Sequence, residues 1–468
     1  MRKEIGGVHN EMVLGTFKLL ELVDRARTGP LIPEAEFESK LVPVKLKELV
    51  AQYDIRRDPQ VLIPSDDNLA DSVFKAACDL LLDLGVYCTD TGRTIRISDE
   101  DLKEALSCLP ETTIIGSGRE ARELRPRNVE DKRPPIVTGP VEGNCTSQNY
   151  LNILVSIAVE PEIDILCCGS LTDIDGMPII GRSPIEIHAA QREAAWMRQA
   201  AARAGRPGLC LIGAGFEWAA ADFASFNPEH GFRPTDAGCP CIIYPMKTTF
   251  NQLARTKYLL DCGRPMQAFS DQLIGGFTRG AEETVVSSVA HHLANLVLNQ
   301  ANFQELNCQH IHYCNTTNRL SIWCHNLGGQ AIVRNSRIIT SSECFASSAP
   351  CTEMILYEGA AVALSVVSGM NLGPGVCGRG TKGIDTYTGL EARLFAKTGK
   401  VCTGMKREDA NELAHQLVKK YEDKFDNPPV GKTFSECYDA RNIRPTRQWL
   451  ETYEKVAKDL EDLGVKLS

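Results

Sequence analysis

Short apolar runs recur between longer helical patterns along most of this 468-residue chain, and this repeat limits the folds open to it. Eight runs can be counted, at residues 136–138, 163–168, 209–212, 241–244, 266–269, 310–314, 337–340 and 369–372. Short apolar strands that alternate with helices indicate parallel βαβ units. Eight such units predict an α/β fold whose parallel strands close into a (β/α)8 barrel, the TIM barrel.

The rest of the chain divides around this repeat. Residues 1–130 are charged and indicate a mainly helical N-terminal extension, after which DKRPP at residues 131–135 resembles a linker. We place the barrel at residues 131–406 and helices that pack on its outside at residues 407–468. A chain of this length is too long for one small core, which agrees with a barrel plus an extension.

Composition argues against several classes of protein. The chain has 51 Lys and Arg against 60 Asp and Glu, a formal net charge of −9, which does not suit a nucleic-acid surface. Its 18 cysteines stand in apolar runs, as free thiols do in a reducing compartment. No window reaches the ~18 apolar residues of a membrane span, and the first residues lack the core of a signal peptide. We expect a cytoplasmic homo-oligomer that binds neither nucleic acid nor membrane.

One segment, residues 183–218, joins a helix to a strand whose end should face a catalytic site. Ser183 can cap the helix, Glu186 stands at the capping-box position, and Gly205 ends the helix. A short apolar run then breaks into a Gly-Ala-Gly loop, where backbone can approach a ligand. Ile212 is the last side chain before this loop.

In such barrels the chemistry lies at the carboxyl ends of the strands, so the residues there are the candidates for a site. They are Ile212, Phe216, Glu217 and Trp218 after the third strand, Cys239 and Tyr244 around the fourth, Phe269 and Asp271 at the fifth, His310 and His312 on the sixth, and Glu343 after the seventh. No phosphate-binding GxGxxG follows the first strand, and no serine nucleophile elbow is present.

Each candidate also has an ordinary structural explanation. Alternate residues of a strand point the same way, so His310 and His312 can be hydrogen-bonded core histidines. Cys239 can fill apolar space, and the aromatic residues around the mouth can be core packing. Zinc held by His, Cys and Glu is a further alternative, but no CxxC or HExxH spacing supports it, and we expect no metal.

Several segments together resemble one known family. They are GVYCTDTGR at residues 85–93, GSGREA at 116–121, EET at 282–284, PCTEM at 350–354, TGLEAR at 388–393 and GKTFSECYD at 431–439. With the helix, AGRPG turn and apolar step of residues 184–212, their order and spacing resemble the monomethylamine methyltransferases from about Gly85 to the C-terminus. The resemblance implies a metal-free pocket where a genetically encoded pyrrolysine presents a methylamine to Co(I) of a separate corrinoid protein. Ile212 occupies the pyrrolysine position.

The resemblance also implies that the surroundings of this position have changed. By ungapped alignment, the acid expected after the fourth strand falls on Cys239, and the acid expected at the fifth falls on Phe269, with Asp271 two residues on. The amide before PCTEM falls on Glu343. Because Ile212 cannot form an adduct, the methyl donor should need none. A quaternary or otherwise cationic amine meets this condition, since it leaves as a neutral amine.

We therefore expect a methyltransferase that moves a methyl group from a small methylated nitrogen compound to Co(I). Glu343, Asp271 and Glu217 are the expected catalytic acids, and the other candidates should contact the substrate. The chain lacks the DxHxxG pattern of a cobalt-ligating histidine, so we expect no tightly bound cofactor and a corrinoid (cobalamin) supplied by a cognate partner protein. Two alternatives stay open: a zinc-dependent corrinoid methyltransferase for a thiol or alcohol, and a non-catalytic small-molecule binding protein on the same fold.

Overall fold

Two four-stranded parallel sheets form the centre of the protein. The computed structural model describes residues 15–140, 143–213, 216 and 218–467. The sheets have the strand orders β12-β11-β7-β5 and β14-β15-β16-β17, with every neighbouring pair parallel. Their bounds are β5 (Thr138–Gly139), β7 (Ile165–Cys167), β11 (Cys210–Gly213), β12 (Ala237–Gly238), β14 (Gln267–Ile274), β15 (Phe303–His310), β16 (Ile339–Phe345) and β17 (Asn371–Cys377).

Isolated parallel bridges connect the outer strands of the two sheets. Val137, next to β5, pairs with Leu372 of β17. At the other edge Gly238 of β12 pairs with Met266, next to β14, and Cys241 pairs with Phe269. The strands that end each sheet therefore have a parallel neighbour in the other sheet.

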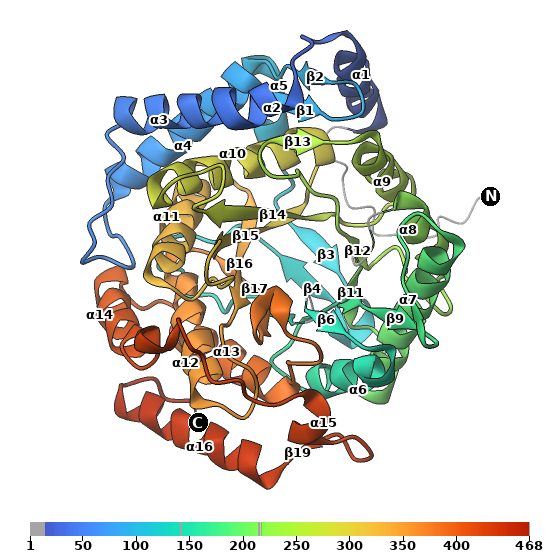
Figure 1. The fold of residues 1–468 in the computed structure, drawn as a ribbon, viewed down its shortest axis with the longest axis vertical. Coiled ribbons are helices and arrows are strands. Elements are labelled where there is room, and N and C mark those ends of the chain that lie inside the picture. The colour runs from blue at the N-terminus through green and yellow to red at the C-terminus, as the bar shows by residue number, and fades with distance from the viewer. Residues whose placement is uncertain (1–14, 141–142, 214–215, 217, 468) are drawn as a thin grey trace, which may run out of the picture.

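A helix follows each of these eight strands, and the helices surround the strands (Figure 1). They are α6 (Ser147–Ala158), α7 (Pro184–Arg203), α8 (Ala219–Ser225), α9 (Phe250–Asp261), α10 (Ala281–Asn299), α11 (Arg319–Asn335), α12 (Glu353–Ala363) and α13 (Gly389–Val401). Strands that alternate with helices in this way confirm the predicted α/β fold.

The start of α7 shows how local sequence sets these elements. The Ser183 hydroxyl accepts a hydrogen bond from the Ile185 amide at 3.3 Å, which confirms Ser183 as the cap. The Glu186 carboxylate accepts from the amide of Arg182 instead of that of Ser183, so the capping-box bond is displaced by one residue. Gly205 follows the helix at φ +74°, in the left-handed region that favours glycine.

Helices before and after the central strands pack on the outside of this core. The N-terminal elements are α1 (Gly15–Thr28), α2 (Glu34–Glu36), a π-helix (Phe37–Leu41), α3 (Val42–Gln52), α4 (Asp67–Leu84) and α5 (Asp99–Ser107), with the hairpins β1 (Val86–Cys88)–β2 (Arg93–Ile95) and β3 (Thr113–Ile115)–β4 (Arg122–Leu124). α4 packs against α10 and α11, so the N-terminal segment shares a hydrophobic core with the central helices.

At the other end of the chain, α14 (Arg407–Val418), the short α15 (Phe434–Cys437) and α16 (Arg447–Asp462) follow α13. α14 and α16 pack against α12. Four buried side chains, Trp449, Tyr453, Val456 and Leu460, form the inner face of α16. Across the part of the chain that the structure describes, no helix is both long and apolar enough to cross a membrane.

The sixth strand differs most from the sequence prediction. It is β15, which ends where the predicted strand at residues 310–314 was to begin. Positions Glu305, Asn307 and Gln309 alternate along β15 and are polar, so the strand offers no apolar run to recognise. The prediction failed because the side chains on this face of the strand are polar and not apolar.

Other strand limits move candidate residues relative to the sheet. The fourth strand, β12, lies before residues 241–244, so Cys239 follows the strand rather than preceding it. β14 and β16 continue past their apolar starts and include Asp271 and Glu343. These two acids therefore stand on strands, where the pleat fixes the direction of their side chains.

Candidate active site

A cavity with a volume of about 640 Å³ opens beyond the carboxyl ends of β12, β14 and β15, the end where the sequence places the site. Its described lining residues are Cys241, Ile242, Ile243, Tyr244, Phe269, Asp271, Leu273, Phe277, Gln309, His310, Ile311 and Cys314. Four of them, Tyr244, Phe269, Asp271 and His310, are sequence candidates. Within this described lining Asp271 is the one carboxylate, and there is no lysine or arginine.

The pleat of β14 turns Phe269, Asp271 and Leu273 toward the cavity. The alternate residue Gln272 faces the helix layer, where its side-chain oxygen accepts a hydrogen bond from Ser287 of α10 at 2.7 Å. Asp271 is therefore presented to the cavity by the strand itself and not by a loop.

Asn307 of β15 orients this carboxylate. The strand register places Asn307 opposite Asp271, and its amide nitrogen donates to Asp271 Oδ1 at 2.7 Å. The donor is neutral, so the bond fixes the carboxylate without cancelling its charge. Asn307 was missed in the sequence because its strand was placed too late.

Aromatic rings form another part of the wall. The rings of Tyr244 and Phe277 lie 5.5 Å apart between centroids. The Tyr244 hydroxyl accepts from the Thr278 amide at 2.7 Å and lies 3.1 Å from the Thr278 hydroxyl. Burial raises the pKa of Tyr244, so its hydroxyl stays neutral, and the contacts with Thr278 hold the ring in place. With Phe269, these rings give the cavity apolar surface and π faces.

The two candidate histidines do not share one direction on a strand, contrary to the prediction. β15 ends at His310, and His312 lies exposed in the turn that follows. Both rings contact Tyr313, with centroid distances of 4.7 Å for His310 and 5.1 Å for His312. Burial, followed by the charge of His312, lowers the pKa of His310, which therefore lines the cavity as a neutral group.

Ile212 points to the interior of the strand array. Its neighbour Gly213 faces Phe232, in the segment between α8 and β12, because a Cβ there would lie 2.2 Å from the Phe232 ring. A Cβ on Gly238, the register partner of Gly213, would lie 2.2 Å from Leu259 of α9. Side chains alternate along β11, so Ile212 faces the opposite way and is fully buried.

Cys239 and Glu343 also lie buried near the interior. The Cys239 thiol donates to the side-chain oxygen of Gln267 at 3.1 Å. The Glu343 carbonyl accepts from the Thr316 hydroxyl at 3.1 Å, and that hydroxyl also accepts from the Phe345 amide at 2.9 Å. Glu343 is 1% exposed and is not among the described residues that line the cavity.

The segment after β11 is anchored through its backbone. The carbonyl of Phe216 accepts from Arg255 at 2.5 Å, and the amide of Trp218 donates to Glu186 of α7 at 3.0 Å. Phe216 is buried and Trp218 precedes α8, but neither lines the cavity in the described part of the chain. Glu217 lies outside the described residues.

A protein metal site needs several donor side chains within reach of one ion. Within residues 15–140, 143–213, 216 and 218–467, no group of three or more His, Cys, Asp and Glu side chains could hold a metal ion. The zinc alternative, built on His310, His312 and Cys239, therefore has no ligand set in the described structure. Cys239 instead bonds Gln267, while His312 is exposed.

Comparison with known proteins places the chain in a family. The family model for monomethylamine methyltransferase MtmB matches residues 17–465. The chain belongs to the MtmB family. Relatives named monomethylamine methyltransferase MtmB1, from Methanosarcina acetivorans and Methanosarcina barkeri, are each 29% identical over 454 residues, covering 96% of this chain and 98% of theirs.

Solved MtmB structures share the fold. The crystal structure of the Methanosarcina barkeri monomethylamine methyltransferase has a TM-score of 0.92 at 28% identity, covering 95% of this chain and 98% of that one. The structure of a hydroxylamine MtmB complex matches with the same values. Membership of the MtmB family identifies this chain as an enzyme that transfers methyl groups.

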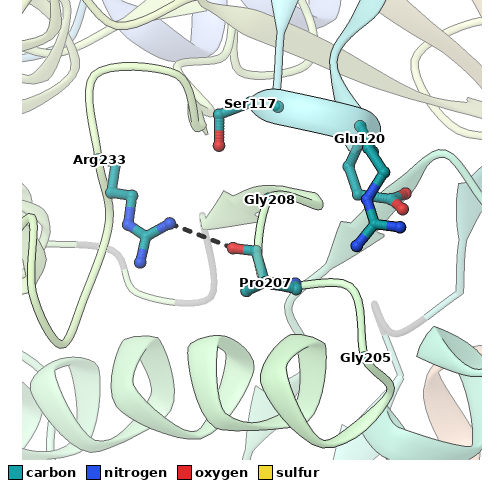
Figure 2. Close-up of a pocket in the computed structure, with 8 residues that line it drawn as sticks. Ser117, Glu120, Gly205, Pro207, Gly208 and Arg233 are labelled. Atoms are coloured by element: carbon teal, nitrogen blue, oxygen red, sulfur yellow. Dashed lines mark hydrogen bonds between the residues drawn. The ribbon is translucent and has the colours of Figure 1, made fainter.

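Two motifs typical of the MtmB resemblance meet away from the active-site cavity. A second cavity, of about 360 Å³, lies beside the start of β11 between GSGREA and the AGRPG turn. In Figure 2 the Arg233 guanidinium reaches the Pro207 carbonyl, at 3.1 Å. The Ser117 amide donates to the Gly208 carbonyl at 2.8 Å, and a Cβ on Gly208 would lie 2.1 Å from the Ser117 oxygen. These motifs are explained by close backbone packing.

Proposed function

We propose that this MtmB-family enzyme transfers a methyl group from a small cationic nitrogen compound, such as a quaternary amine, to Co(I) of a separate corrinoid protein. One observation carries the substrate class: a cavity with ring faces and the Asp271 carboxylate, and no lysine or arginine in its described lining. A methylated cation is attracted by aromatic faces and by a nearby negative charge.

The residue at the pyrrolysine position supports a donor that needs no activation. Ile212 has no nucleophilic or basic group, so it contributes shape and an apolar surface. Methyl transfer from neutral monomethylamine would expel the strongly basic amide ion unless the amine is first activated, whereas methyl transfer from a quaternary ammonium expels a neutral tertiary amine. A pocket with Ile212 at this position therefore suits a donor whose nitrogen already carries a permanent positive charge.

Each candidate residue has a role in this proposal. Asp271, held by Asn307, balances the charge, and Phe269 and Tyr244 bind the methyl groups through their ring faces. Further substrate contacts are assigned to Ile212, Phe216, Trp218, Cys239, His310 and His312, and further negative charge to Glu343 and Glu217. Catalysis would rest mainly on alignment of the methyl carbon with the metal of the acceptor.

The proposal extends to the architecture and to the acceptor. We infer that the eight strands close into one (β/α)8 barrel, supported by the parallel bridges at Val137–Leu372 and Gly238–Met266.

A corrinoid carried by a cognate protein supplies the nucleophilic Co(I), and the mouth of the cavity is the route by which it would approach. We further propose that the protein is a cytoplasmic homo-oligomer without a tightly bound cofactor of its own.

The deciding experiment mixes the purified chain with a cognate corrinoid protein reduced to Co(I) and follows formation of methyl-Co(III) by absorbance. Quaternary amines, betaines and monomethylamine are compared as donors. The proposal expects turnover of a cationic donor in preference to monomethylamine, unchanged by a chelator. Preference for monomethylamine would contradict the proposed role of Ile212. Loss on chelation with recovery by zinc would favour the zinc alternative, and no methyl transfer from any donor would favour a non-catalytic protein.

A further inference from the structure

Two cysteines from distant parts of the chain meet outside the active-site cavity. Cys351 belongs to PCTEM and Cys437 to GKTFSECYD, the segments at residues 350–354 and 431–439. Their sulfur atoms lie 3.0 Å apart although the residues are separated by 86 positions. The active-site geometry gives no role to either segment.

The backbone holds these two segments together independently of the sulfurs. The Lys432 amide donates to the Pro350 carbonyl at 2.9 Å. A Cβ on Gly431 would lie 2.6 Å from the Ala349 oxygen, so the chains are in close contact there. Cys351 stands just before α12, and Cys437 is the last residue of α15. The thiol pair is therefore set by packing and is not a chance approach of flexible side chains.

The two thiols are chemically unequal. Cys351 is half-buried. A hydrogen bond from Cys437 lowers the pKa of Cys351, and the positive charge of Lys432 adds to this effect. Burial and the negative charge of Glu436 act in the opposite direction, but the pKa is lowered on balance. The pKa of the buried Cys437 is raised by its hydrogen bond to Cys351, by burial and by the negative charge of Glu391. The positive charge of Lys432 lowers this pKa, but by less. Cys351 is thus the accessible nucleophile, and Cys437 is the thiol placed to resolve a mixed disulfide.

We propose that Cys351 and Cys437 form a redox modification site, which reacts with low-molecular-weight disulfides to give an intrachain disulfide. The Cys351 thiolate attacks one sulfur of the small disulfide, whose S–S bond breaks and releases one small thiolate. Cys437 then loses its proton and attacks the Cys351 sulfur, which releases the second small thiolate. Two protein thiols are oxidised and one small disulfide is reduced to two thiols.

The bond would fasten the loop after β16 to the segment that leads into α16. That loop also carries Ser347 and Ser348, whose amides donate to the buried carboxylate of Glu358 at 2.8 and 3.3 Å. Oxidation would therefore fix a loop at the carboxyl end of a central strand, on the same end of the strands as the cavity.

The test treats the reduced full-length chain with hydroxyethyl disulfide, then traps free thiols by alkylation and maps peptides by mass spectrometry. The wild type should yield one linked peptide joining Cys351 to Cys437, about 2 Da lighter than the two reduced peptides together because two thiol hydrogens are lost. Cys437→Ala should retain the small thiol on Cys351, because the resolving step is removed. Cys351→Ser should give no link. Cys108→Ser, which removes an exposed cysteine, is the matched control and should behave as the wild type.

Two results would overturn the proposal. One is a stable small-thiol adduct on Cys351 in the wild type, since a neighbouring thiol that can resolve it would remove it. The other is an unreacted Cys351 under conditions in which Cys108 is modified, because reactivity would then follow exposure alone. Circular dichroism of each variant before treatment shows that the comparison is made between folded proteins.

Discussion

The proposed role of Asp271 can be tested by removing its charge and almost nothing else. Asp271→Asn keeps the size and shape of the side chain, and an asparagine oxygen can still accept the hydrogen bond from Asn307. The strand geometry and the aromatic wall should therefore be preserved. We expect weaker binding of a cationic donor and no change in the binding of a neutral molecule of the same shape.

The size of the effect follows from the position of the carboxylate. Two unit charges 4 Å apart attract by about 1 kcal/mol in bulk water and by about 4 kcal/mol at the effective dielectric constant of a protein surface. Asp271 is exposed to the cavity, so an intermediate value of about 2 kcal/mol is appropriate. This corresponds to a roughly 30-fold rise in Kd, since about 1.4 kcal/mol is tenfold.

Isothermal titration calorimetry with a quaternary amine and with its neutral carbon isostere measures this difference directly. The Kd of the quaternary amine relative to that of the neutral isostere should rise by roughly the same factor in Asp271→Asn. Asp462→Asn, which removes an exposed carboxylate from α16, is the matched control and should leave the ratio unchanged. Equal weakening of both ligands would mean that Asp271 shapes the cavity without balancing a charge, and unchanged Kd values for both would mean that it contributes nothing to binding.

Three further predictions concern buried residues. Ile212→Val should keep much of the methyl transfer and lower the free energy of unfolding by about 0.5–1.5 kcal/mol, whereas Ile212→Lys should abolish transfer, as measured by methyl-Co(III) formation. Glu343→Gln should raise the Kd of the cationic donor without unfolding the chain; unchanged calorimetry would assign Glu343 a structural role. Burial raises the pKa of Glu193 from 4.5 to about 8, so its contribution to stability should fall as pH rises from about 4.5 to about 8, and Glu193→Gln should flatten this part of the denaturation profile.

Sequence patterns predicted correctly the helix ends and strands that depend on apolar runs or on residues close in the sequence. The helix cap at Ser183 and the stop at Gly205 depend on neighbours within a few positions, and both are found. Ile212, at the end of a short apolar run, lies on the predicted strand. Such features could be predicted because the responsible interactions are close in the sequence.

The polar interior could not be predicted in the same way. Asn307 and its strand were missed because the inward face of β15 carries amides and a carboxylate, which an apolar pattern does not detect. A two-residue alternation of polar and apolar positions was the signal that would have found it. The bond between Asn307 and Asp271 joins residues 36 positions apart, and only the strand register brings them together.

The position of Asp271 on β14 bears on where a cationic donor would lie in the cavity. The resemblance puts the expected acid at Phe269, and residues two apart on a strand share a face at a spacing of about 6.6 Å. Moving the carboxylate from that position to Asp271 shifts the negative charge along β14 toward the open end of the cavity. Under the proposed function, the positive charge of the donor would then be held nearer the mouth, by which the corrinoid protein would approach, while Ile212 supplies apolar surface. Under the proposed function, Ile212 and the position of the Asp271 carboxylate both suit a donor that is already cationic and needs no activation.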